Sequence, residues 1–429
     1  MLLVYTQKVT PRITYIFKHI CTRILGLEIN LTSVVEDLIS YDGAKLSYGK
    51  KPMGNELFVQ SHGLLSQQGF ESEEILVRPW EDTKCFFSVM DISALPFDIF
   101  SAGFYLLSRY EEYLPHVKDS QGRFPANESL AFKNDFLEQP VIDIWAYKFK
   151  QVLIDKFPTL LLEKKSMEIH SLVMVKQPFA FKQQGFFRSL IGFTNDLFKF
   201  KMKKIVERTS VIFGSRTDPY DTFDWIINTS KNNHPITVFF LLGDALLFEE
   251  NINTTRQKFK MLVKYVADYK EVGLIFSYAS LSNYELLKKE KKRIEEITNR
   301  TLEGSLNAEL LVKLPENYRN LVELEVQKDF TMVYDDTPGF RAGTCTPFLF
   351  YDLDYEIKTP LIIHPLVATT TSFKDKYASD ITKTMARLMN SVEQVNGTFS
   401  LLFTNKDFTP VASNEVWRTF FSEKLHADD

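Results

Sequence analysis

The sequence has little of what marks several large classes of protein. It contains three cysteines in 429 residues, Cys21, Cys85 and Cys345, without a CxxC spacing, so neither a disulfide framework nor a cysteine-rich metal site is expected. No stretch reaches the ~18 uninterrupted apolar residues of a membrane span, and the opening MLLVYTQKVTPR lacks the apolar run and cleavage site of a signal peptide. These absences favour a cytoplasmic protein.

The sequence also lacks a large excess of charge of either sign. The net charge is -4 with a pI near 6.1, which gives no general attraction to nucleic acid. No nucleic-acid partner is therefore expected. Phenylalanine, by contrast, is abundant, with 37 residues, and we interpret it as an aromatic-rich core.

The length suggests two domains. Residues 1–165 read as an N-terminal α/β domain of unknown role. Its predicted elements are a strand at Leu2–Tyr5, a helix from Pro11, short strands at Leu57–Gln60 and Glu74–Val77, an amphipathic helix from Pro96 and a helix at Val141–Lys156. Residues 166–429 form the second predicted domain. In the N-terminal domain, Glu111 and Glu112 are adjacent on a predicted helix and point about 100° apart. We therefore favour an exposed or salt-bridged edge of this helix over a catalytic dyad.

The second predicted domain begins with an apolar, β-branched strand, Ile169–Val175. Helical and short apolar segments alternate after it, among them a predicted strand at Leu361–Val367. This alternation is typical of a parallel barrel or a doubly wound sheet. Ligands in such folds lie at the carboxyl ends of the strands. The first strand carries Met174 and Lys176 there, and neither is a usual ligand for a hydrolytic metal.

A basic segment interrupts this pattern at about 181–216. It holds eight Lys or Arg residues against two acidic ones, with phenylalanines between them. Its central lysines are Lys199, Lys201, Lys203 and Lys204, and we call the segment the basic arm. Two interpretations stay open: a helical insertion packed through its Phe face, or an amphipathic helix on an anionic membrane surface.

Two stretches give the chain a resemblance to a known family. SALPFDIFSAGFYLLSRYEEYLPH and PGFRAGTCTPF, the latter followed by YDLDYEI, resemble the polysaccharide deacetylase family, in a bacterial branch with an uncharacterised N-terminal domain. The resemblance implies α/β architecture with a distorted (β/α)7 barrel. It also implies an Asp–His–His metal site that hydrolyses acetyl groups on sugars, the metal activating a water molecule.

The catalytic positions do not match the family pattern. The family's two aspartates fall on Met174 and Lys176 of LVMVKQPFAF, and its metal histidine falls on Ile275 of GLIFSY. A later histidine falls on Thr404 of LFTN, and a third motif offers Leu306 and Ala308 in place of Arg and His. Residues that flank these positions in the family pattern are present, among them Phe179, Ser277, Tyr278 and Asn405. The candidate vestigial pocket comprises Met174, Lys176, Ile275, Ser277, Tyr278, Arg341 and Thr404.

Three functions follow from this pattern. The favoured one is a catalytically inactive relative without a cofactor, which binds a carbohydrate, a glycan precursor or a partner protein. Lys176 then either places its ammonium where the family holds a cation or extends to solvent. The first alternative is an active hydrolase of acetylated carbohydrate with a divergent site and a divalent metal such as zinc. The second is a membrane-surface assembly protein that uses the basic arm.

Overall fold

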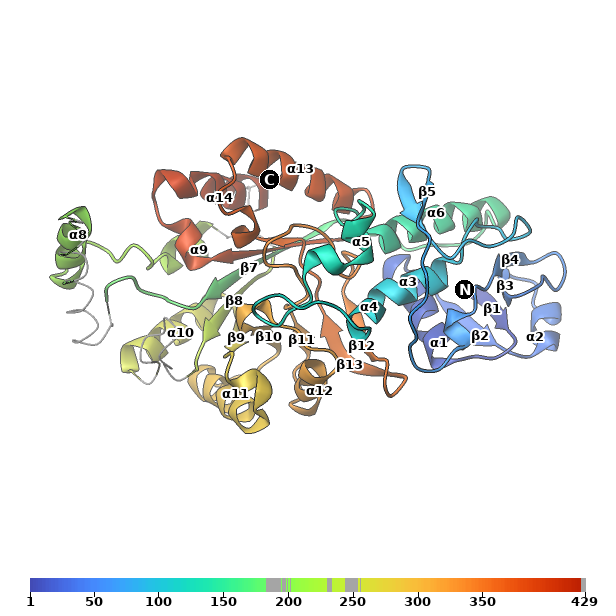
Figure 1. Ribbon diagram of the computed structural model, residues 1–429, viewed down its shortest axis with the longest axis horizontal. Coiled ribbons are helices and arrows are strands. Elements are labelled where there is room, and N and C mark those ends of the chain that lie inside the picture. Colours follow the sequence, from blue (N-terminus) through green and yellow to red (C-terminus); the bar gives the residue numbers. More distant parts are fainter. Residues whose placement is uncertain are drawn as a thin grey trace. The chain divides into compact units, whose positions relative to one another are not determined.

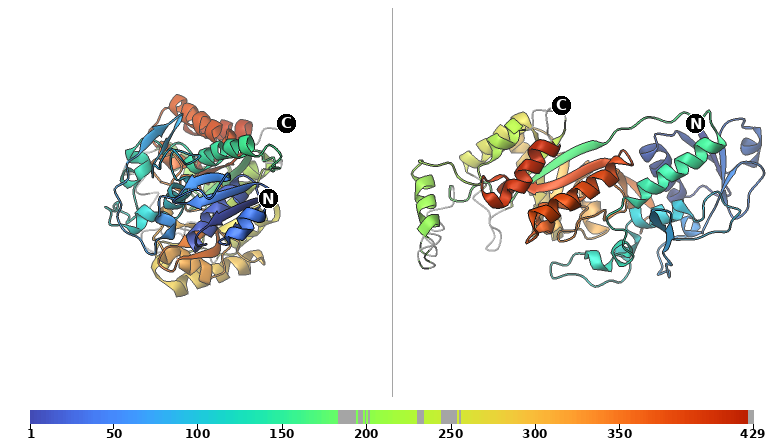
Figure 2. Two further views of the ribbon diagram at one scale, coloured as in Figure 1. Left: turned by 90° about the vertical axis from the view of Figure 1, so that its right-hand side faces the viewer. Right: turned by 90° about the horizontal axis from the view of Figure 1, so that it is seen from above.

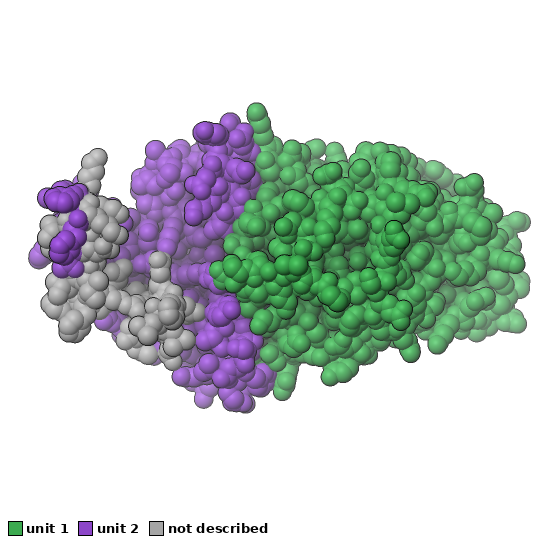
Figure 3. Space-filling model, viewed as in Figure 1, with its two compact units in different colours: residues 1–168, 310–368, 383–400 green, residues 169–309, 369–382, 401–429 purple. Residues whose placement is uncertain are grey.

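The computed structural model describes residues 1–182, 194, 198, 200, 202–229, 234–243, 254 and 256–425. The chain divides into two compact units (Figure 3). Unit 1 comprises Met1–Glu168, Leu310–Ala368 and Lys383–Ser400, and unit 2 comprises Ile169–Glu309, Thr369–Thr382 and Leu401–Asp429. The chain thus passes from the first unit to the second close to the predicted boundary, and two later segments return to unit 1.

Unit 1 contains a four-stranded parallel sheet in the order β2-β1-β3-β4. Its strands are β1 (Leu2–Thr6), β2 (Ile29–Thr32), β3 (Lys45–Gly49) and β4 (Leu57–Gln60). A separate antiparallel pair follows in the chain, β5 (Arg78–Trp80) and β6 (Thr83–Cys85). All five residues of β1 are buried, because both faces of a parallel sheet are covered.

Unit 1 also contains seven described α-helices, and aromatic side chains pack between several of them. The helices are α1 (Pro11–Phe17), α2 (Val35–Ser40), α3 (Ile99–Leu107), α4 (Tyr110–Tyr113), α5 (Leu130–Lys133), α6 (Val141–Lys156) and α12 (Glu316–Glu323). Helix α6 lies alongside the four strands in Figures 1 and 2. The rings of Phe17 and Phe100 stack with centroids 3.6 Å apart, and the buried Trp145 meets Phe97 edge-on at 5.1 Å. The predicted aromatic-rich core is confirmed here.

Helix α1 continues without a break into a π-helical stretch, Lys18–Ile24. The later segments of unit 1 add β11 (Lys328–Asp329), β12 (Phe348–Asp352) and β13 (Ile357–Ile363). β11 pairs with β13 in parallel and β12 pairs with it in antiparallel.

Unit 2 is built on parallel strands. β7 (Glu168–Val175), β8 (Ile236–Leu241), β9 (Glu271–Phe276) and β10 (Gly304–Asn307) follow the order β10-β9-β8-β7-β15. Three elements cross the boundary between the units: β14 (Ala368–Thr369), α13 (Ala378–Glu393) and β15 (Thr398–Thr404). Every residue of β8 is buried, as its continuous apolar run predicts.

Helices of unit 2 lie on both sides of these strands. The helices of this unit are α8 (Met202–Ile212), α9 (Phe223–Thr229), α10 (Gln257–Tyr269), α11 (Tyr284–Thr298) and α14 (Glu415–Thr419). Figure 1 shows α10 and α11 on one side and α9 and α14 on the other, whereas α8 stands apart from the strands. None of the described helices combines the length and hydropathy that crossing a bilayer requires.

The mixed α/β class predicted from the sequence is therefore confirmed. Within the described residues, the strand pairings do not close into a ring, so the (β/α)7 barrel that the resemblance implies is not confirmed. The reading of residues 1–165 as a separate domain stays a prediction.

Candidate functional site

The carboxyl ends of the unit 2 strands are the first place to look for a site. Register fixes them at one edge: Val175 lies opposite Phe240, Leu241 opposite Ile275, and Phe276 opposite Asn307. The residues that follow each strand therefore emerge together. We call this region the strand-end edge.

An ion pair occupies the strand-end edge. Lys176, one residue beyond β7, donates from Nζ to Oε1 of Glu309 over 2.6 Å. Glu309 follows β10 in a short 3₁₀ turn and has a left-handed φ of 55°. The side chains keep 33% and 41% of their exposure, so the pair remains open to solvent. Glu309 was not among the predicted site residues, because only the fold brings it to Lys176.

The positions at which the family pattern has metal ligands hold unsuitable side chains. Met174 is 7% exposed and Ile275 is fully buried in β9. The alkyl side chain of Ile275 cannot coordinate a metal, and the thioether of Met174 is not a usual zinc ligand. No group of three or more His, Cys, Asp or Glu side chains in the described ranges is arranged to hold an ion. The described residues therefore do not fit the divalent metal that the resemblance implies.

Thr404 has a structural task in the described geometry. Its side chain and that of Asp407 form a reciprocal cap at the turn that follows β15, in which the Thr404 N–H donates to Asp407 Oδ2 over 2.7 Å. Thr370 also donates to this oxygen, over 2.7 Å. Burial raises the pKa of the Asp407 carboxyl. These contacts account for Thr404 without a role in proton transfer.

Two residues that match the family pattern also support the local fold. Ser277 donates from its backbone N–H and its hydroxyl to the carboxylate of Glu290, over 3.0 and 2.6 Å. Asn405 donates from Nδ2 to the carbonyl oxygens of Gln177 and Tyr220, over 3.1 and 2.9 Å. Loop geometry thus accounts for the presence of these two residues.

Tyr278 differs from its neighbours because it is 48% exposed. It follows Ser277 at the end of β9. A half-exposed aromatic ring beside polar groups is typical of a binding surface. The strand-end edge therefore holds the half-exposed ring of Tyr278 and the Lys176–Glu309 ion pair.

Arg341, the remaining candidate, belongs to unit 1. Its guanidinium is buried and donates from Nε and Nη2 to both oxygens of Glu112, over 3.0 and 2.8 Å. Arg109 donates to Glu112 over 2.8 Å and to Glu111 over 2.9 Å. We call Arg109, Glu111, Glu112 and Arg341 the ionic cluster. It joins the two stretches that carry the family resemblance, and a place for Arg341 in a pocket stays a prediction.

The charges within the ionic cluster are matched. Burial opposes ionisation of Glu112, but the charges of Arg341 and Arg109 outweigh it, so the pKa of this carboxyl is lowered. Burial raises the pKa of the Glu111 carboxyl, and the positive charge of Arg109 partly offsets this increase. Arg109 itself has a left-handed φ of 54° and ends the first part of the predicted helix from Pro96. Glu111 and Glu112 are salt-bridged, as expected, but both are buried.

The basic arm is described only in part. Lys199 and Lys201 lie outside the described residues, whereas Lys203 and Lys204 belong to α8. Lys204 is exposed.

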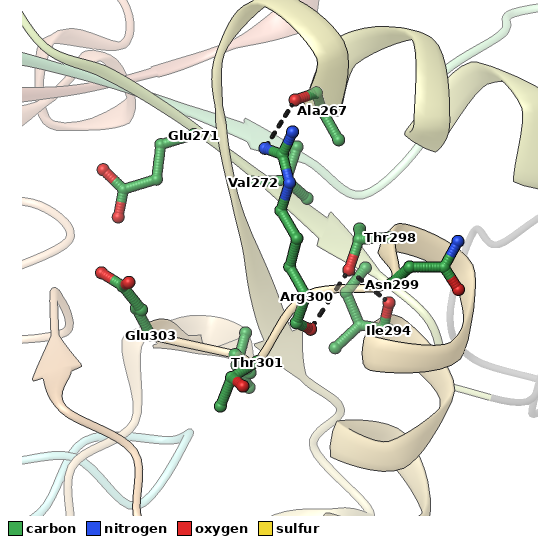
Figure 4. A pocket seen from close by; sticks show the side chains of 10 residues that line it. Ala267, Glu271, Val272, Ile294, Thr298, Asn299, Arg300, Thr301 and Glu303 are labelled. Atoms are coloured by element: carbon green, nitrogen blue, oxygen red, sulfur yellow. Dashed lines mark hydrogen bonds between the residues drawn. The ribbon is translucent and has the colours of Figure 1, made fainter.

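A pocket of about 490 Å³ lies at the opposite, amino-terminal edge of unit 2 (Figure 4). Its rim carries Glu271 and Glu303, whose side chains extend to the same side, and Arg300, which donates to the Ala267 carbonyl over 2.8 Å. Thr237 donates to Glu271 over 3.1 Å. Catalytic sites in parallel α/β folds lie at the carboxyl end, so we assign no chemistry to this pocket.

The chain is similar in part to one sequence family and to several solved structures. A family model described as a family of unknown function (DUF7033) matches residues 2–158, and no curated protein matches the chain. A structure described as a polysaccharide deacetylase from Mycobacterium smegmatis is 11% identical, with a TM-score of 0.39 over 62% of this chain and 86% of that chain. One described as a glycoside hydrolase/deacetylase from Parabacteroides distasonis is 10% identical, with a TM-score of 0.35 over 61% and 68%. Likenesses this weak do not establish a shared fold or activity.

Proposed function

We propose that this chain is a polysaccharide-deacetylase-like protein that binds a carbohydrate or glycan precursor without hydrolysing it. The ligand would lie at the strand-end edge of unit 2. The observation that carries the proposal is the Lys176–Glu309 ion pair at 2.6 Å. An ammonium stands there beside a carboxylate, and an ammonium cannot activate water as a metal does.

The same ion pair supplies groups that suit a sugar. An ammonium has three donors and a carboxylate accepts through both oxygens, so the pair can satisfy adjacent hydroxyl groups. Tyr278 adds an exposed apolar ring with a polar tip. A few polar groups beside an aromatic surface are the usual lining of a small-molecule site.

A direct test is calorimetric titration with oligomers of N-acetylglucosamine. Tyr278→Ala should weaken binding at least about fivefold, because truncating a central aromatic contact costs more than ~1 kcal/mol. Tyr377→Ala is the matched control, since Tyr377 is also in unit 2 and is 80% exposed. Release of acetate from these oligomers by the zinc-loaded protein would refute the proposal and favour the active hydrolase.

The basic arm supports a second function, attachment to an anionic membrane surface. Met202, Val206 and Phe213 are 60%, 58% and 86% exposed. The spacing of Met202 and Val206 places them on one side of α8, and Phe213 follows the last residue of this helix. Lys204 is exposed nearby. Solvent-exposed apolar side chains beside a lysine fit the interface of an anionic bilayer.

Flotation with phosphatidylserine vesicles tests this second function. Binding at low salt should weaken steeply as salt rises, since the screening length is about 10 Å at 0.1 M. Val206→Asp should abolish it, whereas Met261→Asp, at an exposed position of α10, should not. Equal loss in both variants, or no binding at low salt, would leave only the packing interpretation of the arm.

A further inference from the structure

A small basic pocket in unit 1 is separate from everything that the proposed function uses. It measures about 270 Å³ and lies where α1 and its π-helical continuation meet β12 and β13. Tyr15 and Leu349 give it an apolar wall, and the Tyr15 hydroxyl donates to the Leu349 carbonyl over 2.7 Å. Its volume suits a small ligand.

The unusual member of the pocket is His19. Its side chain is 2% exposed, and neither ring nitrogen has a hydrogen-bond partner. The ring meets Phe348 edge-on, with centroids 6.3 Å apart. A neutral imidazole carries one donor and one acceptor, and leaving such groups buried without partners costs about 1–3 kcal/mol each. A buried polar group of this kind calls for a partner that the protein does not supply.

Positive charge surrounds His19. Lys18, Arg23 and Lys358 line the pocket with it, and Lys165 donates to the Arg23 carbonyl. In the part of the chain that is described, none of these four cations forms an ion pair with a carboxylate. The pKa of His19 is lowered to about 3, chiefly by burial and further by the charges of Arg23 and Lys165. His19 therefore stays neutral at pH 7.

We propose that this pocket binds a phosphate monoester with a small apolar group. The phosphate would lie among Lys18, Arg23 and Lys358, beside the His19 ring. The apolar group would rest against Tyr15 and Leu349. A dianion is favoured over a carboxylate because Lys18, Arg23 and Lys358 all line the pocket, and because a guanidinium matches the geometry of phosphate oxygens.

Phenyl phosphate is a suitable probe for titration calorimetry with the full chain. We expect it to bind at least about tenfold more tightly than benzoate, which has the ring but one charge fewer. Arg23→Gln and Lys358→Gln should each weaken binding about tenfold. Lys51→Gln is the matched control, because Lys51 is an exposed lysine of unit 1 outside the pocket. No binding at millimolar concentration, or equal binding of benzoate, would overturn the proposal.

Nuclear magnetic resonance of the histidine rings gives an independent readout on the native chain. The chain has 7 histidines, and the spectrum of His19→Gln identifies the resonance of His19. Phenyl phosphate should shift this resonance and raise the pKa of His19, because the anion offsets the charges of Arg23 and Lys165. Saturable binding that leaves the His19 resonance and pKa unchanged would place the ligand elsewhere and overturn the assignment.

Discussion

Replacing Arg341 with Met tests whether the GFRAG stretch supports the fold of unit 1. The substitution removes two donors from Glu112 and one, at 3.1 Å, from the Val333 carbonyl. Glu112 then remains buried with Arg109 as its only cation. Removing one partner of a buried ion pair typically costs about 3–5 kcal/mol, a large part of a total stability of roughly 5–15 kcal/mol.

A loss of that size is measurable by thermal unfolding. In a unit of this length, 1 kcal/mol corresponds to about 2–4 °C, so the midpoint of unit 1 should fall by roughly 6–20 °C. The double variant Glu112→Leu with Arg341→Met should recover much of the loss, because it leaves Arg109 and Glu111 as a matched pair. Arg387→Met is the control: its ion pair with Glu138 is exposed, and such pairs contribute about 1 kcal/mol or less.

Near-ultraviolet circular dichroism follows the loss of tertiary packing around aromatic side chains, which lie in both units. An Arg341→Met variant with the same unfolding midpoint as the Arg387→Met variant would refute the structural role of Arg341. It would also return Arg341 to the list of candidate binding residues. A double variant less stable than Arg341→Met would contradict the charge-matching explanation.

Three further predictions concern single side chains. Lys176→Met should lower stability by no more than about 1 kcal/mol, since its ion pair is partly exposed; a larger loss in denaturant unfolding would mean that the pair organises the strand-end edge. Asp143→Ala should cost about 3 kcal/mol or more by the same assay, because buried Asp143 accepts from Thr344, Thr346 and the Cys345 N–H; a loss below 1 kcal/mol would contradict this. His19 should make the fold acid-sensitive: its folded pKa is lowered to about 3, so above pH 6.5 it contributes nothing, and the penalty grows as pH falls, reaching about 2 kcal/mol at pH 5. His19→Gln should remove this part of the pH dependence, and an unchanged profile would refute it.

Patterns within one element were predicted well from the sequence. β4 at Leu57–Gln60 and α6 at Val141–Lys156 lie within the predicted bounds, because local apolar spacing determines both. The helix from Pro96 instead breaks at Arg109, whose guanidinium turns inward to the ionic cluster. A strand predicted at Leu361–Val367 begins earlier, as β13 at Ile357, because Pro360 lies at an exposed position that needs no ladder hydrogen bond.

Contacts between distant residues could not be predicted in this way. For Lys176, the sequence left open a head group in solvent or one in the place of a cation. The answer is a partly exposed pair with Glu309, 133 positions away. The predicted strand at Glu74–Val77 is absent from the described structure, and nothing in the local pattern around His19 indicates its cationic surroundings.

The metal content of the purified protein tests the central claim most directly. After dialysis against zinc, nickel and cobalt salts and removal of free ions, mass spectrometry should find well below one ion per chain. The reason is that Met174, Lys176 and Ile275 cannot provide the ligands that these metals require. One tightly held ion per chain, lost in Glu309→Gln, would contradict the account and favour an active hydrolase.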